Sequence, residues 1–340
     1  MMRSLSVPLL VLSLVWAFVV GPARAAPAKA QVIVLSNSSP HVSVIDAQSS
    51  QVIKTADIPQ MTSWAWNDDN NYYDGKHLWL GMRNPDTNEV EVILLDLDSL
   101  QVARRIPLGQ DRVTVYIGKP SRQGKVLVSK HASGEIVAID ARSFAVVSTA
   151  TLPVEGGFAC DIDIAPGPGN IDRAFVPTNP SDLIIAVDAA TLRVLQTVRF
   201  PGNNPFMLTA SPDGSQVWVQ ERAGNSLAVL NARTLQLVKR LPTGKTPIIG
   251  TFSPDGARHF TGHSADTQVI AHDTRTFKEV WRAHAGTNPD KLGVHPAGTF
   301  VFAALSREGA VAVLDARTGK VAARIALGTN PVGIFVRRLR

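Results

Sequence analysis

The chain has 340 residues, of which 45% are hydrophobic and 18% charged, and its formal net charge at neutral pH is +6. This balance excludes an intrinsically disordered chain and allows a large buried core. The single cysteine, Cys160, excludes an intramolecular disulfide, a zinc site built on cysteine pairs and a C-x-x-C-H haem attachment.

Residues 1–25 have the features of a secretory signal peptide. Arg3 gives a positive start, an apolar run extends from Val7 to Val20, and a small-x-small cleavage sequence ends at Ala25. The run is shorter than the roughly 20 apolar residues that cross a bilayer, and no later stretch reaches that length. We therefore predict cleavage after Ala25, a periplasmic or secreted product, and no membrane span after cleavage. The alternative is an uncleaved N-terminal anchor.

One short phrase occurs seven times along the rest of the chain. An apolar run ends in Asp or Asn, Ser or Thr follows three places later, and a second apolar segment comes next, as in VAVLDARTGKVAARIA from Val311. An Asp or Asn at a strand end can accept hydrogen bonds from backbone N–H groups two and three residues later, so we predict structural turns here. The seven anchors lie 42 to 50 residues apart: Asp46, Asp96, Asp140, Asp188, Asn231, Asp273 and Asp315.

The segments between these turns are short and rich in Val, Ile and Leu, which indicates strands. Before the later phrases, Gly-x-x-Pro enters a strand, Pro-Asp-Gly or Pro-Ala-Gly turns the chain, and a second strand leaves, as in 202–220, 244–262 and 286–304. Four strands in a repeat of this length are typical of a β-propeller blade. We predict an all-β fold in which residues 26–340 form one seven-bladed β-propeller domain with four antiparallel strands in each blade.

The last repeat is incomplete, because GTNPVGIFVRRLR from Gly328 supplies only one strand. The segment QVIVLSNSS, from Gln31 to Ser39, stands before the first phrase and can supply the next strand. We therefore predict that the two chain ends share one blade, with one C-terminal and three N-terminal strands. This arrangement closes the ring and removes exposed sheet edges.

These units resemble the repeat of the YVTN family of seven-bladed propellers, in which Gly-x-x-Pro and Ser-Pro-Asp-Gly precede a Tyr-Val-Thr-Asn strand end. The resemblance covers the chain after the signal peptide and is closest in the last four blades. The Thr-Asn ending survives as Thr178-Asn179 and, in altered form, as Ser36-Asn37. The resemblance implies an exported propeller but no single function, since a fold does not determine one.

In propellers of this kind, the first strand of each blade lines the central channel. The loops that enter it share one rim with the loops between second and third strands. The resemblance thus implies that cations and histidines gather on this rim: Arg83, Arg112, Lys130, His131, Arg222, Lys245, His263 and Arg307. Such a rim favours a carboxylate or phosphate ligand. The alternative is that these are solvated charges paired with neighbouring acids such as Asp86, Glu221, Asp266 and Glu308.

Three blades depart from the repeat where they enter the channel, in residues 60–75, 111–124 and 156–169. The first brings Trp64 and Trp66, which either offer stacking surface to a planar or sugar-like ligand or pack between blades. The second brings Tyr116. We predict a ligand site at the channel mouth formed by Trp64, Trp66, Arg83, Arg112, Tyr116, His131, Arg222, His263 and Arg307.

The leading functional hypothesis is a monomeric, non-catalytic binding or scaffold propeller whose partner is an anionic small molecule or a periplasmic protein. The chain is also distantly similar to the haem-binding propeller of periplasmic nitrite reductase, which implies haem binding or haem assembly as a second hypothesis. Haem is then the cofactor, and the candidate iron ligands are His41, His131 and His263. The other histidines are not clustered, so no further metal site is expected.

An enzyme of the lactonase or lyase type is a third hypothesis, with Asp161, Asp163 and Asp290 as candidate acids. Asp163 is either a general base or the acceptor of a hydrogen bond from the next strand. No G-x-S-x-G, phosphate-loop or H-E-x-x-H sequence occurs. Cys160 is expected to pack as a small apolar side chain.

Binding of single-stranded DNA is a fourth hypothesis, because basic rims with aromatic side chains suit base stacking and phosphate contact. Cleavage of the signal removes Arg3 and Arg24 from the 34 basic residues and leaves all 28 acids, so the net charge becomes 32 − 28 = +4. A charge this small makes nucleic acid a weaker hypothesis than a small anion.

Overall fold

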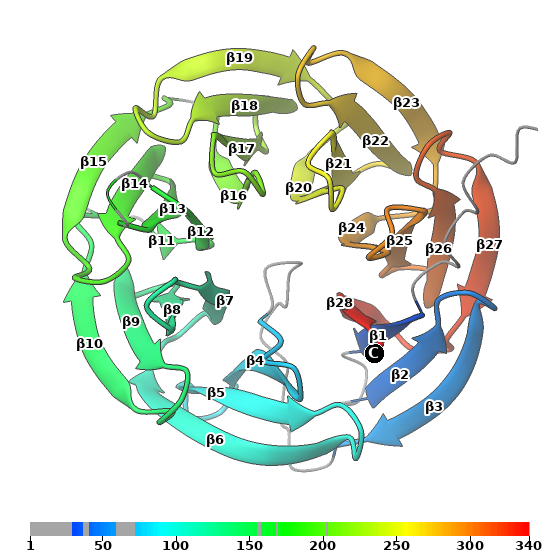
Figure 1. The fold of residues 1–340 in the computed structure, drawn as a ribbon, viewed down its shortest axis with the longest axis horizontal. Coiled ribbons are helices and arrows are strands. Elements are labelled where there is room, and N and C mark those ends of the chain that lie inside the picture. The colour runs from blue at the N-terminus through cyan, green and yellow to red at the C-terminus, as the bar shows by residue number, and fades with distance from the viewer. Residues whose placement is uncertain are drawn as a thin grey trace, which may run out of the picture.

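The computed structural model describes residues 29–36, 41–58, 72–154, 158–167, 169, 171–201 and 203–339. Seven β-sheets in this part of the chain surround a central hole, so the predicted seven-bladed propeller is confirmed (Figure 1). None of its elements is a helix that could span a membrane. The predicted signal peptide, Trp64 and Trp66 lie outside the described residues.

Blades 5, 6 and 7 are the most regular, each with four consecutive antiparallel strands. Blade 5 consists of β16 (Pro205–Ala210), β17 (Gln216–Glu221), β18 (Ser226–Asn231) and β19 (Leu237–Pro242). Blade 6 consists of β20 (Pro247–Phe252), β21 (Arg258–His263), β22 (Gln268–Asp273) and β23 (Glu279–His284). Blade 7 consists of β24 (Pro289–Val294), β25 (Phe300–Leu305), β26 (Ala310–Asp315) and β27 (Val321–Ala326).

Blades 2, 3 and 4 contain the departures from the repeat. Blade 2 has β4 (His77–Arg83), β5 (Glu89–Asp96) and β6 (Gln101–Gln110), and on the channel side the backbone of Tyr72 accepts a hydrogen bond from Trp79. Blade 3 has β7 (Val115–Pro120), β8 (Lys125–Lys130), β9 (Glu135–Asp140) and β10 (Val146–Thr151). The innermost strand of blade 4 is broken into β11 (Phe158–Ala159) and β12 (Asp163–Ala165), followed by β13 (Arg173–Asn179), β14 (Leu183–Asp188) and β15 (Val194–Arg199).

Blade 1 closes the ring as predicted. Its strand order is β28 (Pro331–Arg338), β1 (Ala30–Ser36), β2 (His41–Asp46) and β3 (Gln51–Asp57), with β28 nearest the channel. β1 and β28 are antiparallel, with Ile33 opposite Phe335, and lie side by side in Figure 1. The two ends of the described chain therefore hold each other in one sheet.

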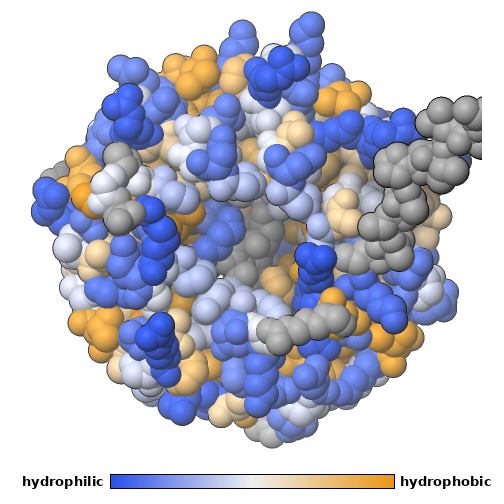
Figure 2. Space-filling view, viewed as in Figure 1, coloured by the Kyte–Doolittle hydropathy of each residue, from blue (hydrophilic) through white to orange (hydrophobic). Residues whose placement is uncertain are grey.

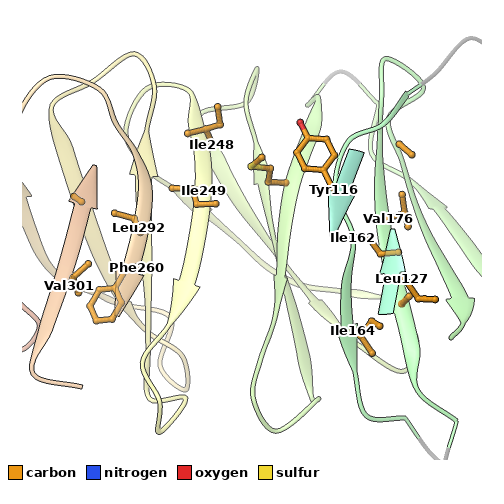
Figure 3. Packing of buried hydrophobic residues seen from close by; sticks show 14 of the residues in the cluster. Tyr116, Leu127, Ile162, Ile164, Val176, Ile248, Ile249, Phe260, Leu292 and Val301 are labelled. Carbon is orange, nitrogen blue, oxygen red and sulfur yellow. The ribbon is translucent and has the colours of Figure 1, made fainter. Parts of the chain in front are cut away.

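The core lies between the blades, because each sheet packs both of its faces against neighbours. Leu127, Ile162 and Val176 come from two neighbouring blades and belong to one buried cluster (Figure 3). The outermost strands cover this core and face solvent, so β19 exposes Leu237 and Val238. Burial on both faces explains why the inner strands read as continuous apolar runs.

The repeated Asp turns have the predicted geometry. The Oδ1 atom of Asp315 accepts hydrogen bonds from the backbone N–H of Thr318 at 2.8 Å and from its hydroxyl at 2.7 Å. The bonds from Thr318 hold the pKa of the Asp315 carboxyl below its ordinary value. These turns join third to fourth strands, so they lie on the rim opposite the predicted ligand site.

Candidate functional site

The predicted rim residues lie in two kinds of loop, those that enter the innermost strand and those that follow the second strand of a blade. Arg112 precedes innermost strand β7, whereas Arg83, His131, Arg222, His263 and Arg307 end or follow second strands. Because neighbouring strands are antiparallel, both kinds of loop lie at the same end of each blade. Figure 2 views the opposite rim, where β1 begins and β28 ends, and shows hydrophilic side chains around the central hole there as well.

Four of the predicted residues gather on blades 3, 4 and 5, together with two phenylalanines that the sequence analysis did not single out. The guanidinium carbon of Arg112 lies 5.8 Å from the Phe158 ring centroid, and that of Arg222 lies 4.3 Å from the Phe206 ring. The His131 ring lies 5.2 Å from the Phe158 ring and 5.7 Å from the Tyr116 ring. We call this set the aromatic–arginine arc: Arg112, Tyr116, His131, Phe158, Phe206 and Arg222.

Cys160 connects the two halves of this arc and is not reactive. Burial raises the pKa of its thiol to about 12, while the nearby guanidinium of Arg222 acts in the opposite direction. Blades 4 and 5 are in contact next to Cys160, since Asp161 accepts the N–H of Leu208 at 3.1 Å. A thiol with so high a pKa is not a nucleophile at neutral pH, and its packing as a small apolar group agrees with the sequence expectation.

The arginines of the arc have no carboxylate partner among the described residues, and neither does Arg307. Glu221 instead pairs with Arg240 at 2.8 and 2.9 Å. Glu308 likewise pairs with Arg324 at 2.8 Å. Glu221 and Glu308, two of the acids expected to neutralise the rim, are therefore paired with arginines of outer strands and not with Arg222 or Arg307.

The three candidate haem ligands differ in what their ring nitrogens contact. In His263, Nδ1 contacts the Gln268 carbonyl oxygen at 2.9 Å and Nε2 accepts the Gly244 N–H at 3.1 Å, so both nitrogens are engaged. His41 contacts Asp57 at 2.8 Å on the outer strands of blade 1, away from the channel. His131 has a buried Nδ1 without a hydrogen-bond partner in the described structure. Burial lowers the pKa of His131 to about 4, so the imidazole is neutral at pH 7, as metal ligation requires.

Two of the three candidate acids hold the scaffold together. Asp163 is fully buried, and its oxygens accept the N–H groups of Ile164 and Ala210, both at 2.8 Å. The ammonium group of Lys119 lies 3.0 Å from the same carboxylate. Asp161 similarly accepts the N–H of Leu208 at 3.1 Å. Both acids therefore fasten blade 4 to β16 of the next blade, which was one of the two sequence interpretations of Asp163.

Asp290 differs from this pattern. Its Oδ2 accepts hydrogen bonds from Asn288 Nδ2 at 2.9 Å and from the Ser306 hydroxyl at 3.1 Å. Its Oδ1 is buried and has no hydrogen-bond partner in the described chain. Burial raises the pKa of the Asp290 carboxyl above its ordinary value. The next residue, Lys291, is fully buried in the channel-lining strand and was not singled out from the sequence.

The surface hollows do not coincide fully with these groups. A groove of about 480 Å³ lies on the opposite rim between blades 6 and 7, lined among others by Asp255, Arg258 and Arg317. Its carboxylates and hydroxyls belong to the repeated turns and are hydrogen-bonded there. A hollow of about 290 Å³ beside Arg112 is lined also by Asp111 and Ser133. We favour the channel mouth as the site because Arg112 and Arg222 lie against aromatic rings and have no carboxylate partner in the described residues. Lys130, another predicted rim cation, is instead paired with Glu135.

Comparison with known proteins identifies the fold alone. No protein-family model matches the chain, so membership of the YVTN family is not established, and no curated protein matches. A solved protein from Lactobacillus plantarum has 12% identity over 91% of this chain and 100% of that chain, with a TM-score of 0.74. The periplasmic gluconolactonase PpgL of Pseudomonas aeruginosa has 16% identity over 92% and 100%, with a TM-score of 0.71. The dihydro-heme d1 dehydrogenase NirN in complex with DHE has 17% identity over 90% and 65%, with a TM-score of 0.61.

Proposed function

We propose that the protein is an exported, non-catalytic propeller that binds an anionic, planar ligand on the aromatic–arginine arc. The observation that carries the proposal is the pair of guanidinium groups, each stacked on a phenylalanine ring and each without a carboxylate partner in the described residues. A guanidinium held against a ring keeps its in-plane N–H donors free for a carboxylate or phosphate. The predicted signal peptide and the periplasmic gluconolactonase among the similar structures support export.

The arc supplies two kinds of contact from a rigid base. Arg112 and Arg222 offer charge-assisted hydrogen bonds to anionic groups, while the half-buried Phe158 and Phe206 offer ring surface. The Nε atom of Arg222 is buried and has no acceptor in the described chain, so an anion at this place would satisfy it. The ligand therefore needs an acidic group next to a flat apolar ring.

Isothermal titration with metal-free protoporphyrin IX and with naphthalene-2,6-dicarboxylate tests this proposal. We expect Arg222→Gln to weaken binding at least tenfold, because a hydrogen bond to a charged group contributes about 1.5–3 kcal/mol. Arg275→Gln is the matched control, since Arg275 is exposed in a turn of the opposite rim and the change in charge is the same. Equal affinities of both variants and the parent protein would refute the proposal.

Haem itself is the second candidate ligand, favoured by the unpartnered Nδ1 of His131. The haem-related NirN propeller in the comparison supports testing it. We expect His131→Ala to abolish a Soret shift on haem addition while binding of the metal-free porphyrin persists. An unchanged Soret shift in His131→Ala would exclude iron ligation by this residue, and the same measurement on His41→Ala and His263→Ala compares the other two candidates.

The remaining hypotheses are outcomes of further simple assays. The gluconolactonase among the similar structures makes lactone hydrolysis worth measuring, and Asp290 is the acid to replace because Asp161 and Asp163 fasten the scaffold. Retention on single-stranded DNA with a steep salt dependence would favour nucleic acid. A periplasmic protein that competes with the porphyrin for the arc would make the propeller a scaffold.

A further inference from the structure

Four innermost strands begin in the same way, which allows a residue-by-residue comparison. β16, β20, β24 and β28 each start at a proline, and each pairs with its second strand through a bulge at the following residue. A bulge redirects the side chain of the extra residue. The bulged residues are Phe206, Ile248, Asp290 and Val332.

In three of these blades the bulged residue is apolar, and in blade 7 it is not. Its bulged residue is a carboxylic acid that is only 5% exposed, whereas Ile248 and Val332 bury apolar side chains at the same place. The next position holds Lys291, where blades 5 and 6 have Met207 and Ile249. Burial of charged groups costs free energy, and three blades fold without it, so the scaffold does not require these residues. Exceptions of this kind are expected at functional sites.

Two oxygen atoms beside this bulge are buried without a hydrogen-bond donor in the described part of the molecule. One is Oδ1 of Asp290, and the other is Oδ1 of Asn288, whose side chain is bonded to Asp290 through its nitrogen. Asn288 is 9% exposed, and Ser306 donates its hydroxyl to the other oxygen of Asp290. An acceptor left in this state is destabilising until a donor reaches it.

We infer that Asn288, Asp290 and Ser306 form a second ligand site at the channel mouth, which binds the hydroxyl groups of a neutral sugar or polyol. The ligand hydroxyls donate to Oδ1 of Asp290 and Oδ1 of Asn288. A metal ion or an amine suits the site less well, because the ammonium group of Lys291 lies 3.0 Å from the backbone oxygen of Asp290 and repels a second cation. An anion is excluded because the two unpartnered oxygens of Asp290 and Asn288 accept hydrogen bonds and would repel a negative charge.

This inference is independent of the arc, since the site belongs to blade 7 and the arc to blades 3, 4 and 5. The neighbouring blade supplies the matched variants. Blade 6 has Ile248 and Thr246 where blade 7 has Asp290 and Asn288, so Asp290→Ile and Asn288→Thr change blade 7 into the form of a blade that already folds. Asp290→Asn is a third variant that retains the shape of the side chain.

Saturation-transfer NMR of residues 26–340 with D-glucose and with sorbitol tests the site. Calcium is added in competition as a probe for cation binding. We expect both polyols to bind, Asp290→Ile and Asn288→Thr to weaken binding at least tenfold, and Arg222→Gln to leave polyol binding unchanged. Absence of polyol binding to the parent protein overturns the inference, and so does polyol binding that persists in both blade 7 variants. Stabilisation by calcium that Asp290→Asn abolishes overturns it in favour of a cation site. Loss of porphyrin binding in Arg222→Gln is a separate readout, so the two proposals can fail independently.

Discussion

The innermost strands of blades 4 and 7 both carry buried carboxylates, and they differ in how these are satisfied. Asp163 of blade 4 gives its oxygens to two backbone N–H groups and an ammonium group. Asp290 of blade 7 leaves one oxygen without a donor in the described chain. Burial of an acid in a channel wall therefore does not by itself identify a site. The hydrogen-bond partners do, because a satisfied acid stabilises the scaffold and an unsatisfied one does not.

The histidines show the same contrast. His263 uses both ring nitrogens to bind the backbone of its own blade and of the loop that enters it. His131 is equally neutral at pH 7 but has a nitrogen without a partner among the described residues. Five measurements test this division and the closed ring on which it depends.

The largest effect is expected from removal of β28, the innermost strand of blade 1. Deletion of residues 331–340 leaves β1 without its channel-side partner and opens blade 1. We expect the cooperative thermal transition, measured by circular dichroism, to disappear, because a propeller depends on ring closure to protect its edges. Deletion of residues 339–340 alone retains β28 and is the control. A truncated chain that melts like the parent protein would contradict the closed ring.

The histidine contrast predicts unequal costs for the same substitution. His263→Leu leaves the buried Gly244 N–H and the Gln268 carbonyl without partners, so it should lower the free energy of unfolding by about 2–4 kcal/mol. His131→Leu removes no hydrogen bond described here and should change it by less than about 1 kcal/mol. Urea denaturation measures both. Equal losses of unfolding free energy would show that hydrogen-bond partners do not distinguish the roles of the two histidines.

Acid should destabilise the protein through its buried histidines. Burial lowers the pKa of His131, His263 and His272 to about 4, whereas in the unfolded chain these side chains have the ordinary histidine pKa of about 6.5. The unfolded chain thus binds more protons between these values, so stability is complete above pH 6.5 and falls as the pH drops to 4. We expect a loss of up to about 3 kcal/mol for each histidine, and a smaller loss in His131→Leu. A stability that is constant between pH 7 and 4.5 would contradict this prediction.

The smallest effect on unfolding free energy is expected in the repeated turns, which lie outside both proposed sites. The hydroxyl of Thr318 donates to Asp315, whereas Asp188 accepts only backbone N–H groups in its own turn, including that of Thr191. Thr318→Ala should therefore lower the free energy of unfolding by about 0.5–1 kcal/mol, and Thr191→Ala by less. Denaturant titration of both variants measures the difference. A larger loss in Thr191→Ala would mean that the turn hydroxyls act in another way.

The sequence predicted the ring, its closure and the Asp turns because each depends on a local pattern that recurs along the chain. It also selected Arg112, Tyr116, His131 and Arg222, which the structure brings to neighbouring blades. Phe158 and Phe206 were not selected because an aromatic residue in an apolar strand looks like core. Lys291 and the difference between Asp163 and Asp290 could not be predicted, since partners come from other blades and from loops distant in sequence. An alignment of the repeats at the proline that begins each innermost strand could have revealed the exception. It places Asp-Lys in blade 7 where blades 6 and 5 have Ile-Ile and Phe-Met.

The most direct test is the free energy of unfolding of Asp163→Asn and Asp290→Asn, measured side by side in urea. In Asp163→Asn an amide nitrogen replaces one acceptor oxygen and leaves a buried N–H unsatisfied, so we predict a loss of about 1–3 kcal/mol. In Asp290→Asn the two existing hydrogen bonds can be kept and the buried charge is removed, so we predict no loss or a gain. Equal losses in the two variants would contradict the separation of scaffold acids from site acids.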